Sequence, residues 1–430
     1  MFAKSSRLLF RQKSKRLPFF NFQPIKGLAV RPGTPLVSRI GSSTLTLHLT
    51  GELCANSLKL SDTEIEALTS ETVKKHFSLL LVLSVAFACG TESKSKKQPA
   101  DPPPDPTLAT GPSPVRTGPI ADIYKEVFAS VTQDLLLQDL KEMTGVVPVT
   151  VDGQSVTISD RYLPASKQRF RAYWTQFFRN LGVVVTELPY STKHRIGELE
   201  GHNLEAVLPG KTKDSVVIIV HYDSIGPTGS ESSNPGVDDD MTGMAMLLET
   251  ARVLVARKAQ LANTVRFVAV DYEEHTSPGL EGSRQYAAYL KQKATTEAFQ
   301  IVAAVDDEQT GWNCHGDNLC SDSQGDLFDI FSCSGDSKGY SYPALGDRME
   351  KIATELGGMR VLRGCIGQES DHYAMWEIGV PSLTFTEHDP HHNNHFDSKG
   401  GDIYAKIDTD YFFKIARIGV VFAAELSGLD

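Results

Sequence analysis

The sequence lacks three features that would assign it to a well-defined class. No apolar run approaches the roughly 20 residues that a membrane-spanning helix needs, which argues against a polytopic membrane protein. Cysteine is scarce, with 6 among 430 residues, so the chain is not a small scaffold built on disulfides. Basic residues are outnumbered, and the formal net charge is -10. Because phosphate binding needs a basic surface, this balance argues against nucleic acid as a partner.

What the chain does contain is typical of a soluble globular protein with a sizeable core. Hydrophobic residues make up 40% and charged residues 22%. The length alone suggests two or three domains at roughly 150 residues each. The charge is uneven, because residues 1–72 carry a net +5 and the chain from Cys89 onward a net -17. The basic head therefore needs an explanation of its own.

Residues 73–88 resemble a secretory signal peptide. Lys74 and Lys75 precede a short apolar stretch, Phe77–Ala88, and Cys89 follows small residues as in the lipobox of bacterial lipoproteins. Residues 89–120 are rich in Pro, Ser, Lys and Asp, which predicts a disordered tether. We therefore expect an exported lipoprotein of the bacterial cell envelope, held at the membrane only through a lipid on Cys89.

A signal peptide belongs at an N-terminus, yet 72 residues precede this one. Our hypothesis is that translation starts at Val73 from a GTG codon, which makes residues 1–72 a spurious extension. Alternatively, Arg7, Arg11 and Arg16 belong to an organelle-targeting peptide, or Phe77–Ala88 is a core segment of a longer protein. N-terminal sequencing of the native protein tests this, and any peptide from residues 1–72 contradicts the hypothesis.

Residues 121–430 read as one α/β domain with a mostly parallel central sheet flanked by helices. Continuous apolar runs predict buried strands, and helical spacing of apolar residues predicts helices between them. The predicted strands are Val216–Val220, Thr264–Val270, Ile301–Val305 and Pro381–Phe385. The predicted helices cover Phe170–Leu181, Asp239–Ala256 and Tyr411–Leu426, and a further helix ends near Tyr286–Lys291.

Carboxylates and histidines follow the predicted strands, where ligands bind in such sheets. His221 and Asp223 share a face at one strand end, so His221 can bind a metal while Asp223 fixes its ring. Of Glu273 and Glu274, one can ligate while the other serves as a general base. Each motif alone has an ordinary structural explanation, such as an Asp238–Asp240 helix cap. Together, at successive strand ends, they predict a pair of divalent metals.

These motifs as a set resemble the co-catalytic dizinc aminopeptidases, whose zinc-exopeptidase fold is shared with glutaminyl-peptide cyclotransferases. The resemblance covers about Tyr162 to Leu426. It is carried by His221–Ser224, Pro235–Ala245, Val270–Glu274, Gly282–Tyr286, Ser370–His372 and Gly379–Pro381. It implies that His221 binds one metal, Asp239 bridges both, Glu274 is a ligand and Glu273 is the general base. Asp223 and the Ser370–His372 turn then support the site.

The sequence departs from the family pattern at two ligand positions. Glu308 stands where an Asp is usual, three residues before a glycine; either Glu308 ligates with its longer arm or Asp307 replaces it, and we favour Glu308. For the last histidine ligand we favour His395 over His391 and His392. The family has an Asp four residues after that His, a spacing that neither Asp397 nor Asp402 meets.

Four cysteines lie in the catalytic region, an even number that suggests two disulfides in an exported protein. We expect the pairs Cys314–Cys320 and Cys333–Cys365. Buried free thiols are the alternative, and more plausible for a cytoplasmic protein.

The resulting functional prediction is an exported, monomeric aminopeptidase that hydrolyses N-terminal residues from peptides. It uses two Zn²⁺ ions, or other divalent metals, and a metal-bridging water deprotonated by Glu273. One alternative is a glutaminyl-peptide cyclotransferase, which by family resemblance uses one zinc. A second is an inactive binding module that has lost its metals, for which the substitution at Glu308 is the only support.

Overall fold

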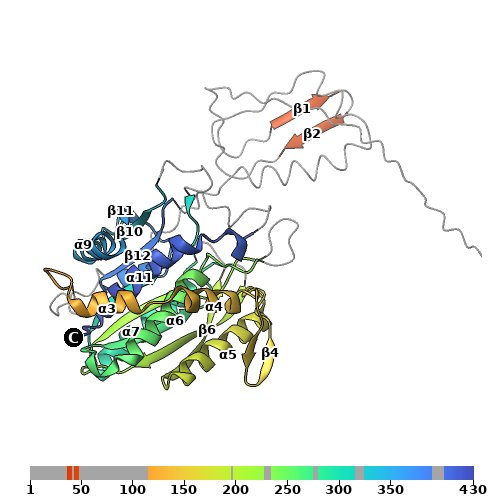
Figure 1. The fold of residues 1–430 in the computed structure, drawn as a ribbon. Helices are drawn as coiled ribbons and strands as arrows, with labels where there is room; N and C mark the ends of the chain where they lie inside the picture. The colour runs from red at the N-terminus through yellow and green to blue at the C-terminus, as the bar shows by residue number, and fades with distance from the viewer. Residues whose placement is uncertain are drawn as a thin grey trace, which may run out of the picture. The chain divides into compact units, whose positions relative to one another are not determined.

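The computed structural model describes residues 36–40, 43–47, 115–194, 197–226, 234–274, 279–314, 324–389 and 401–430. The chain divides into two compact units, Met1–Ala100 and Asp101–Asp430. In the first unit β1 (Leu36–Ile40) pairs antiparallel with β2 (Ser43–Leu47), as Figure 1 shows. The expected signal peptide, Cys89 and tether up to residue 114 lie outside the described residues.

The second unit is organised around an eight-stranded mixed sheet of order β11-β10-β12-β9-β7-β8-β6-β5. Its strands are β5 (Val184–His194), β6 (Gly197–Leu208), β7 (Ser215–His221), β8 (Thr264–Val270), β9 (Ile301–Asp307), β10 (Leu327–Ser334), β11 (Arg360–Ile366) and β12 (Ser382–Glu387). Four of the seven neighbouring pairs are parallel, which confirms the predicted α/β class with a mostly parallel sheet. A small hairpin, β3 (Val149–Val151) and β4 (Gln154–Val156), stands apart from it.

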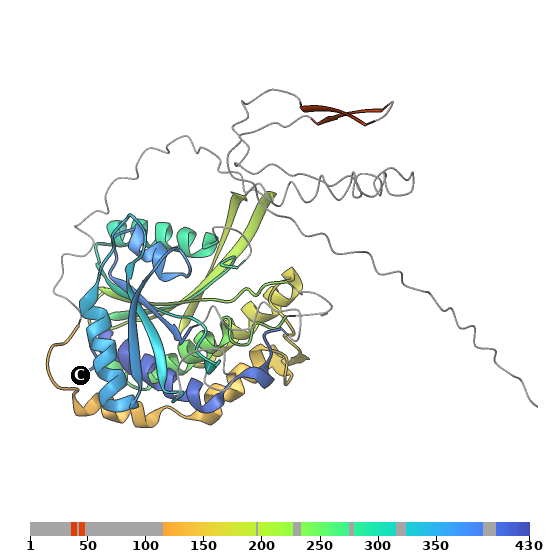
Figure 2. The same ribbon diagram turned by 90° about the horizontal axis from the view of Figure 1, so that it is seen from above.

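Helices cover both faces of this sheet. They are α3 (Asp122–Ser130), α4 (Gln133–Met143), α5 (Pro164–Asn180), α6 (Met241–Ala256), α7 (Glu281–Glu297), α9 (Pro343–Ile352), α10 (His372–Glu377) and α11 (Thr409–Leu426), with short turns at Lys258–Gln260, Ala353–Gly357 and Tyr404–Lys406. In Figure 2, α7 and α10 lie on one side of the sheet and α6 and α11 on the other. No helix in the described part of the chain is both long and apolar enough to cross a membrane.

Strand β7 shows why the central strands carry continuous apolar runs. Successive side chains of a strand point to opposite faces. Val216, Ile218 and Val220 accordingly join the core under α6 and α11, whereas Val217 and Ile219 join the core under α7. All seven residues of β7 are buried. A strand covered on both faces has no solvent side, so no polar alternation appears in its sequence.

The predicted elements all occur, but α5 begins six residues before Phe170 and α7 continues six residues beyond Lys291, whereas the ends of the others shift by at most two residues. Strand β8 has the predicted bounds, but β9 continues to Asp307, because Asp306 and Asp307 pair with Thr384 and Phe385 of β12. Helix α6 begins at Met241 rather than Asp239, since the Asp240 side chain caps it by accepting a hydrogen bond from the Gly243 N–H. The carboxyl ends of β7, β8 and β9 therefore meet at one edge of the sheet.

Candidate functional site

His221 ends β7 as a fully buried imidazole. Its Nδ1 lies 3.1 Å from the main-chain oxygen of Asp223. When Nδ1 carries the hydrogen and donates it to this oxygen, Nε2 has no hydrogen and its lone pair is available to a metal. Nε2 lies 3.1 Å from Asp239 Oδ1 and 3.6 Å from Glu308 Oε1. Burial opposes charge on His221, but Glu308, Asp223 and Asp239 raise its pKa well above the usual value. The site therefore attracts positive charge, either as a proton or as a metal.

Asp223 acts differently from the sequence prediction. Its carboxylate oxygen Oδ1 is 3.6 Å from His221 Nδ1, too long for a hydrogen bond, so the ring is held by the Asp223 carbonyl instead. The carboxylate accepts the main-chain N–H groups of Glu273 at 3.0 Å and Glu274 at 3.3 Å. Asp223 thus links the end of β7 to the segment that carries the predicted general base.

The three consecutive aspartates have three separate roles. Asp238 Oδ1 accepts a hydrogen bond from the Gly311 N–H at 2.7 Å, and Asp240 caps α6. The carboxylate of Asp239, the predicted bridging ligand, lies 3.1 Å from His221 Nε2. The N–H groups of Asp238 and Asp239 both donate to the buried Asp402 carboxylate at 2.8–2.9 Å, and burial raises the pKa of Asp402 to about 7.

Glu273 and Glu274 lie three and four residues after the end of β8 and are partly buried. Burial raises the pKa of both carboxyl groups well above the usual value, and neighbouring carboxylates add to the shift. Asp239 is the largest of these neighbours for Glu274, and Glu308 for Glu273. Both carboxyl groups therefore belong electrostatically to the cluster around His221. Which of them ligates and which is the base stays a prediction.

Strand β9 brings Glu308, rather than Asp307, to His221. Asp307 lies fully buried on the side of its neighbours Ala303 and Val305, and neither of its carboxylate oxygens has a hydrogen-bond partner among the described residues. Glu308 Oε2 instead accepts from Ser370 Oγ at 2.7 Å, while Oε1 faces His221. The longer side chain thus reaches the cluster, as favoured from the sequence.

Ser370 and His372 bind β9 from the other side of the site. Ser370 Oγ also lies 2.7 Å from Asp306 Oδ2, and the same oxygen accepts the His372 N–H at 3.1 Å. Asp371 between them is fully buried, and burial together with Asp306 raises its pKa well above the usual value. The Ser370–His372 turn therefore contacts the site directly, as predicted.

The donor set around His221 fits a divalent metal. One ligand atom each from His221, Asp240 and Glu308 lie within 4.8 Å of one another. His221 Nε2 forms no hydrogen bond with the described residues although it is buried, as a ligand nitrogen would be. One imidazole with carboxylates is a donor set that suits zinc. Asp240 was not among the predicted ligands, because as a sequence feature it reads only as a helix cap.

The last predicted ligand, His395, lies outside the described residues together with His391 and His392. Of the other four predicted metal ligands, His221, Asp239 and Glu308 lie together in the structure, and Glu274 is near enough to interact electrostatically with Asp239. The fifth position stays a prediction from the sequence.

Two buried cations support the site, and sequence reasoning missed both. Arg161 is fully buried and donates to the carbonyls of Met143, Tyr222 and Gly236 at 2.7–3.2 Å. It thereby ties α4 to the loops that carry Asp223 and Asp239. Burial lowers the pKa of Arg161 to about 10. Because these contacts cross up to 75 residues of sequence, nothing local in the sequence indicates them.

The second cation is Lys167 of α5, whose ammonium lies 2.5 Å from Asp271 Oδ1 with both side chains buried. Asp271 also accepts the Tyr222 hydroxyl and the Tyr272 N–H, each at 2.9 Å. Tyr272 has a left-handed backbone, with φ of 60°, directly before Glu273. The ion pair therefore fixes the turn from β8 into the Glu273–Glu274 segment.

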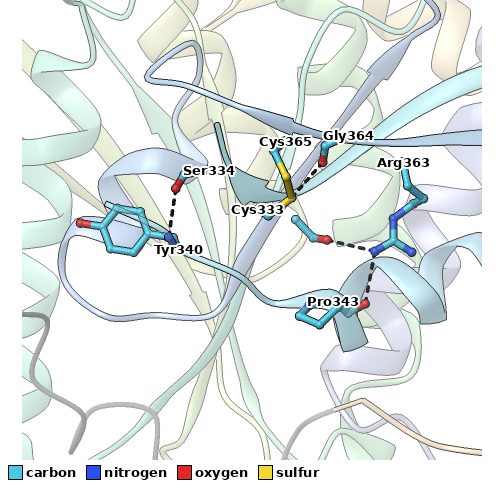
Figure 3. The surroundings of a disulfide bond; sticks show 8 residues. Cys333, Ser334, Tyr340, Pro343, Arg363, Gly364 and Cys365 are labelled. Atoms are coloured by element: carbon cyan, nitrogen blue, oxygen red, sulfur yellow. Dashed lines mark hydrogen bonds between the residues drawn. A yellow bond between two sulfur atoms is a disulfide. The ribbon is translucent and has the colours of Figure 1, made fainter. Parts of the chain in front are cut away.

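A disulfide joins the two strands beside the Ser370 turn. Cys333 of β10 is bonded to Cys365 of β11, which confirms one predicted pair. Figure 3 shows this bond next to Arg363, which donates to the Pro343 carbonyl. Cys314 is disulfide-bonded as well, but Cys320, its predicted partner, lies outside the described residues.

Comparisons with known proteins agree with this fold. The model of peptidase family M28 matches residues 203–422, about half of the chain. A probable leucine aminopeptidase of Arthroderma otae is 21% identical over 319 residues, covering 71% of this chain and 76% of the relative. Leucine aminopeptidase 1 of Ajellomyces capsulatus is 27% identical over 281 residues, covering 63% and 68%.

Solved structures show the same fold at lower identity. The LapA aminopeptidase of Legionella pneumophila superposes with a TM-score of 0.54 at 17% identity, covering 73% of this chain and 78% of that one. A glutaminyl cyclase of Macrostomum lignano gives 0.53 at 17% identity, covering 76% and 98%. The fold is thus the one that both kinds of enzyme share. With the family match over residues 203–422, the chain is a member of peptidase family M28.

Proposed function

We propose that the protein is a metal-dependent aminopeptidase that removes N-terminal residues from peptides with two bound divalent cations, Zn²⁺ by donor type. The observation that carries this proposal is the convergence of His221 and Glu308, at the ends of β7 and β9, with Asp239, which lies just before α6. The Glu273–Glu274 segment is tied to the same cluster through Asp223. The leucine aminopeptidases among the relatives support the same activity.

The proposed reaction gives each residue a defined task. His221, Asp239, Glu274 and Glu308 would hold the cations, and His395 would complete the set. When bound, the cations supply Lewis acidity to the attacking water and to the scissile carbonyl. Glu273 takes the proton of that water and returns it to the leaving amine. Asp223 keeps Glu273 in place through its N–H.

The decisive variant is Glu273→Gln, which keeps the size of the side chain and removes its basicity. We expect turnover of an aminoacyl arylamide to fall at least about 100-fold, the lower range of a general base's contribution, while bound metal is unchanged. Metal content by mass spectrometry and turnover with and without a chelator are the measurements. Near-normal turnover would refute the role of Glu273.

Glu297→Gln is the matched control, because Glu297 lies at the end of α7 in an exposed pair with Lys293. It should leave both readouts unchanged. A parallel assay on peptides that begin with Gln separates the two chemistries of this fold. Cyclisation of those peptides without arylamide hydrolysis would replace the aminopeptidase by a glutaminyl cyclase. Absence of both metal and turnover in the unsubstituted protein would instead indicate a binding module.

A further inference from the structure

Gln309 is held rigidly beside the ligand cluster by its main chain. Its N–H donates to Asp240 Oδ1 at 3.4 Å, and its carbonyl accepts from the Glu387 N–H at 2.8 Å and the Thr386 hydroxyl at 3.0 Å. The backbone is left-handed, with φ of 49°. Such a conformation is uncommon for a residue with a Cβ and persists only where the surroundings enforce it.

The side-chain amide of Gln309 has only one possible orientation. Its Nε2 donates to Asp239 Oδ2 and to Glu308 Oε1, both at 3.2 Å. An ionised carboxylate only accepts hydrogen bonds, so the nitrogen and not the oxygen of the amide must face these two groups. Oε1 is thereby left as the acceptor end of the amide, at the edge of the cluster around His221.

This oxygen lacks a partner in the described structure. Gln309 Oε1 is inaccessible to solvent and accepts no hydrogen bond from the described residues. A buried carbonyl without a donor is unfavourable, and such groups in a native protein call for an explanation. Gln309 as a whole residue is only partly buried, whereas His221 and Asp239 are buried.

The chemistry around Oε1 defines the donor that suits it. The neighbouring side chains are carboxylates, so an incoming hydrogen-bond donor gains most if it carries positive charge. An N-terminal residue presents one such group, its α-ammonium. We propose that Gln309 Oε1 accepts a hydrogen bond from the α-ammonium of the substrate and thereby selects peptides with a free N-terminus. This assignment rests on the proposed aminopeptidase function.

The test compares two inhibitors that differ only in the amine. Leucine hydroxamate carries the α-ammonium and 4-methylpentanohydroxamate lacks it. Their dissociation constants are measured by calorimetry for the metal-loaded wild type, for Gln309→Met and for Gln309→Glu. Methionine resembles glutamine in length and has no comparable acceptor, whereas glutamate keeps an oxygen acceptor. Gln176→Met is the matched control, because Gln176 lies on α5 and its side-chain amide donates to the Thr150 carbonyl of β3.

We expect the wild type to bind the amine-bearing probe at least about tenfold more tightly, and Gln309→Met to reduce that preference by about tenfold, the size of one hydrogen bond to a charged group. Gln309→Glu and Gln176→Met should keep it. If Gln309 only orients the metal ligands, Gln309→Met weakens the binding of both hydroxamates equally. The preference for the amine-bearing probe then stays unchanged, and the proposal is overturned.

Three further outcomes are also informative. If Gln309→Met binds neither probe, the preference of Gln309→Glu for the amine-bearing probe is the test instead. Loss of that preference overturns the assignment, and its retention supports it. If the metal-loaded wild type binds neither hydroxamate, the proposed aminopeptidase function fails, and the assignment of Gln309 fails with it. If the wild type binds both probes equally tightly, the role of Gln309 is wrong, but the proposed aminopeptidase function is not contradicted.

Discussion

Asp271 and Asp306 lie on opposite sides of β7, and the protein satisfies them in different ways. Asp271 follows β8 and Asp306 belongs to β9, the two strands that pair with β7. Asp271 receives the Lys167 ammonium, a tyrosine hydroxyl and a main-chain N–H. Its charge is therefore paired within the protein.

Within the described part of the chain, the β9 side has no such lysine or arginine. Ser370 Oγ lies 2.7 Å from both Asp306 and Glu308, yet a hydroxyl has one hydrogen and can donate to only one of them at a time. Among the described residues, neither carboxylate forms an ion pair with a lysine or an arginine, and the basic side chains beside them are the imidazoles of His372 and His221. The β8 side is thus complete in the protein alone, whereas the β9 side is built to receive positive charge.

The largest loss of stability is expected from Lys167→Met, which removes the ammonium that pairs with Asp271 on the β8 side. It leaves the Asp271 carboxylate buried without its charge partner, which costs about 3–5 kcal/mol of unfolding free energy. Denaturant titration measures the loss. A cost below about 1 kcal/mol would contradict the role given to this pair.

Two further variants show whether the effect is specific to the site. Lys167→Met combined with Asp271→Asn should recover much of the stability, since no buried charge is then left unpaired. Arg348→Met breaks a comparable buried pair with Glu425, far along the chain from the site. It should cost similar stability but spare turnover, whereas Lys167→Met should also lower kcat by displacing Glu273.

Removal of metal should affect the other side of the site. An ion present at 100 times its dissociation constant stabilises the folded protein by about 2.7 kcal/mol, which chelation then removes. Hydrogen exchange should become faster at residues 305–311 and 370–372 and stay unchanged at residues 270–272. Equal acceleration at both places would show that the two sides do not differ as described.

The smallest effect is expected from Ser370→Ala. Loss of the hydroxyl removes a hydrogen bond to the Glu308 carboxylate, and supporting contacts of this kind typically account for a 10–100-fold difference in metal affinity. Competition with a coloured chelator measures the affinity. Ser427→Ala, which removes a buried hydroxyl bonded to the Ala424 carbonyl, is the control and should bind metal normally. Unchanged affinity in Ser370→Ala would show that the hydroxyl is dispensable.

The central strands could be predicted from the sequence because their physical requirements are local. A strand covered on both faces must be apolar throughout, so β7 and β8 stand out as continuous runs. The edge of the sheet was not predicted, since β11 is largely exposed and contains two arginines. The antiparallel pairing of β10 with β12 is a property of the chain's path and leaves no mark in either segment.

The same distinction separates the predicted from the missed site residues. His221, Glu273 and Glu274 lie at or just after the ends of apolar runs. The sequence therefore indicates both where these side chains lie in the fold and what chemistry they offer. Asp402 was noticed only as an aspartate at an unsuitable spacing, yet it accepts the N–H groups of Asp238 and Asp239 across more than 160 residues. Contacts of that range depend on the folded path and are invisible in a single sequence.

The contacts of Arg161 show that the candidate site depends on residues outside the region shared with the peptidase family. The region shared with the peptidase family begins at residue 203, but the guanidinium that fastens the carbonyls of Met143, Tyr222 and Gly236 comes from before it. Lys167 likewise precedes that boundary. The segment that carries these two cations therefore belongs to the structural unit that forms the candidate site. A fragment trimmed to the shared region would keep the predicted ligands but lose the two charges that hold their loops in position.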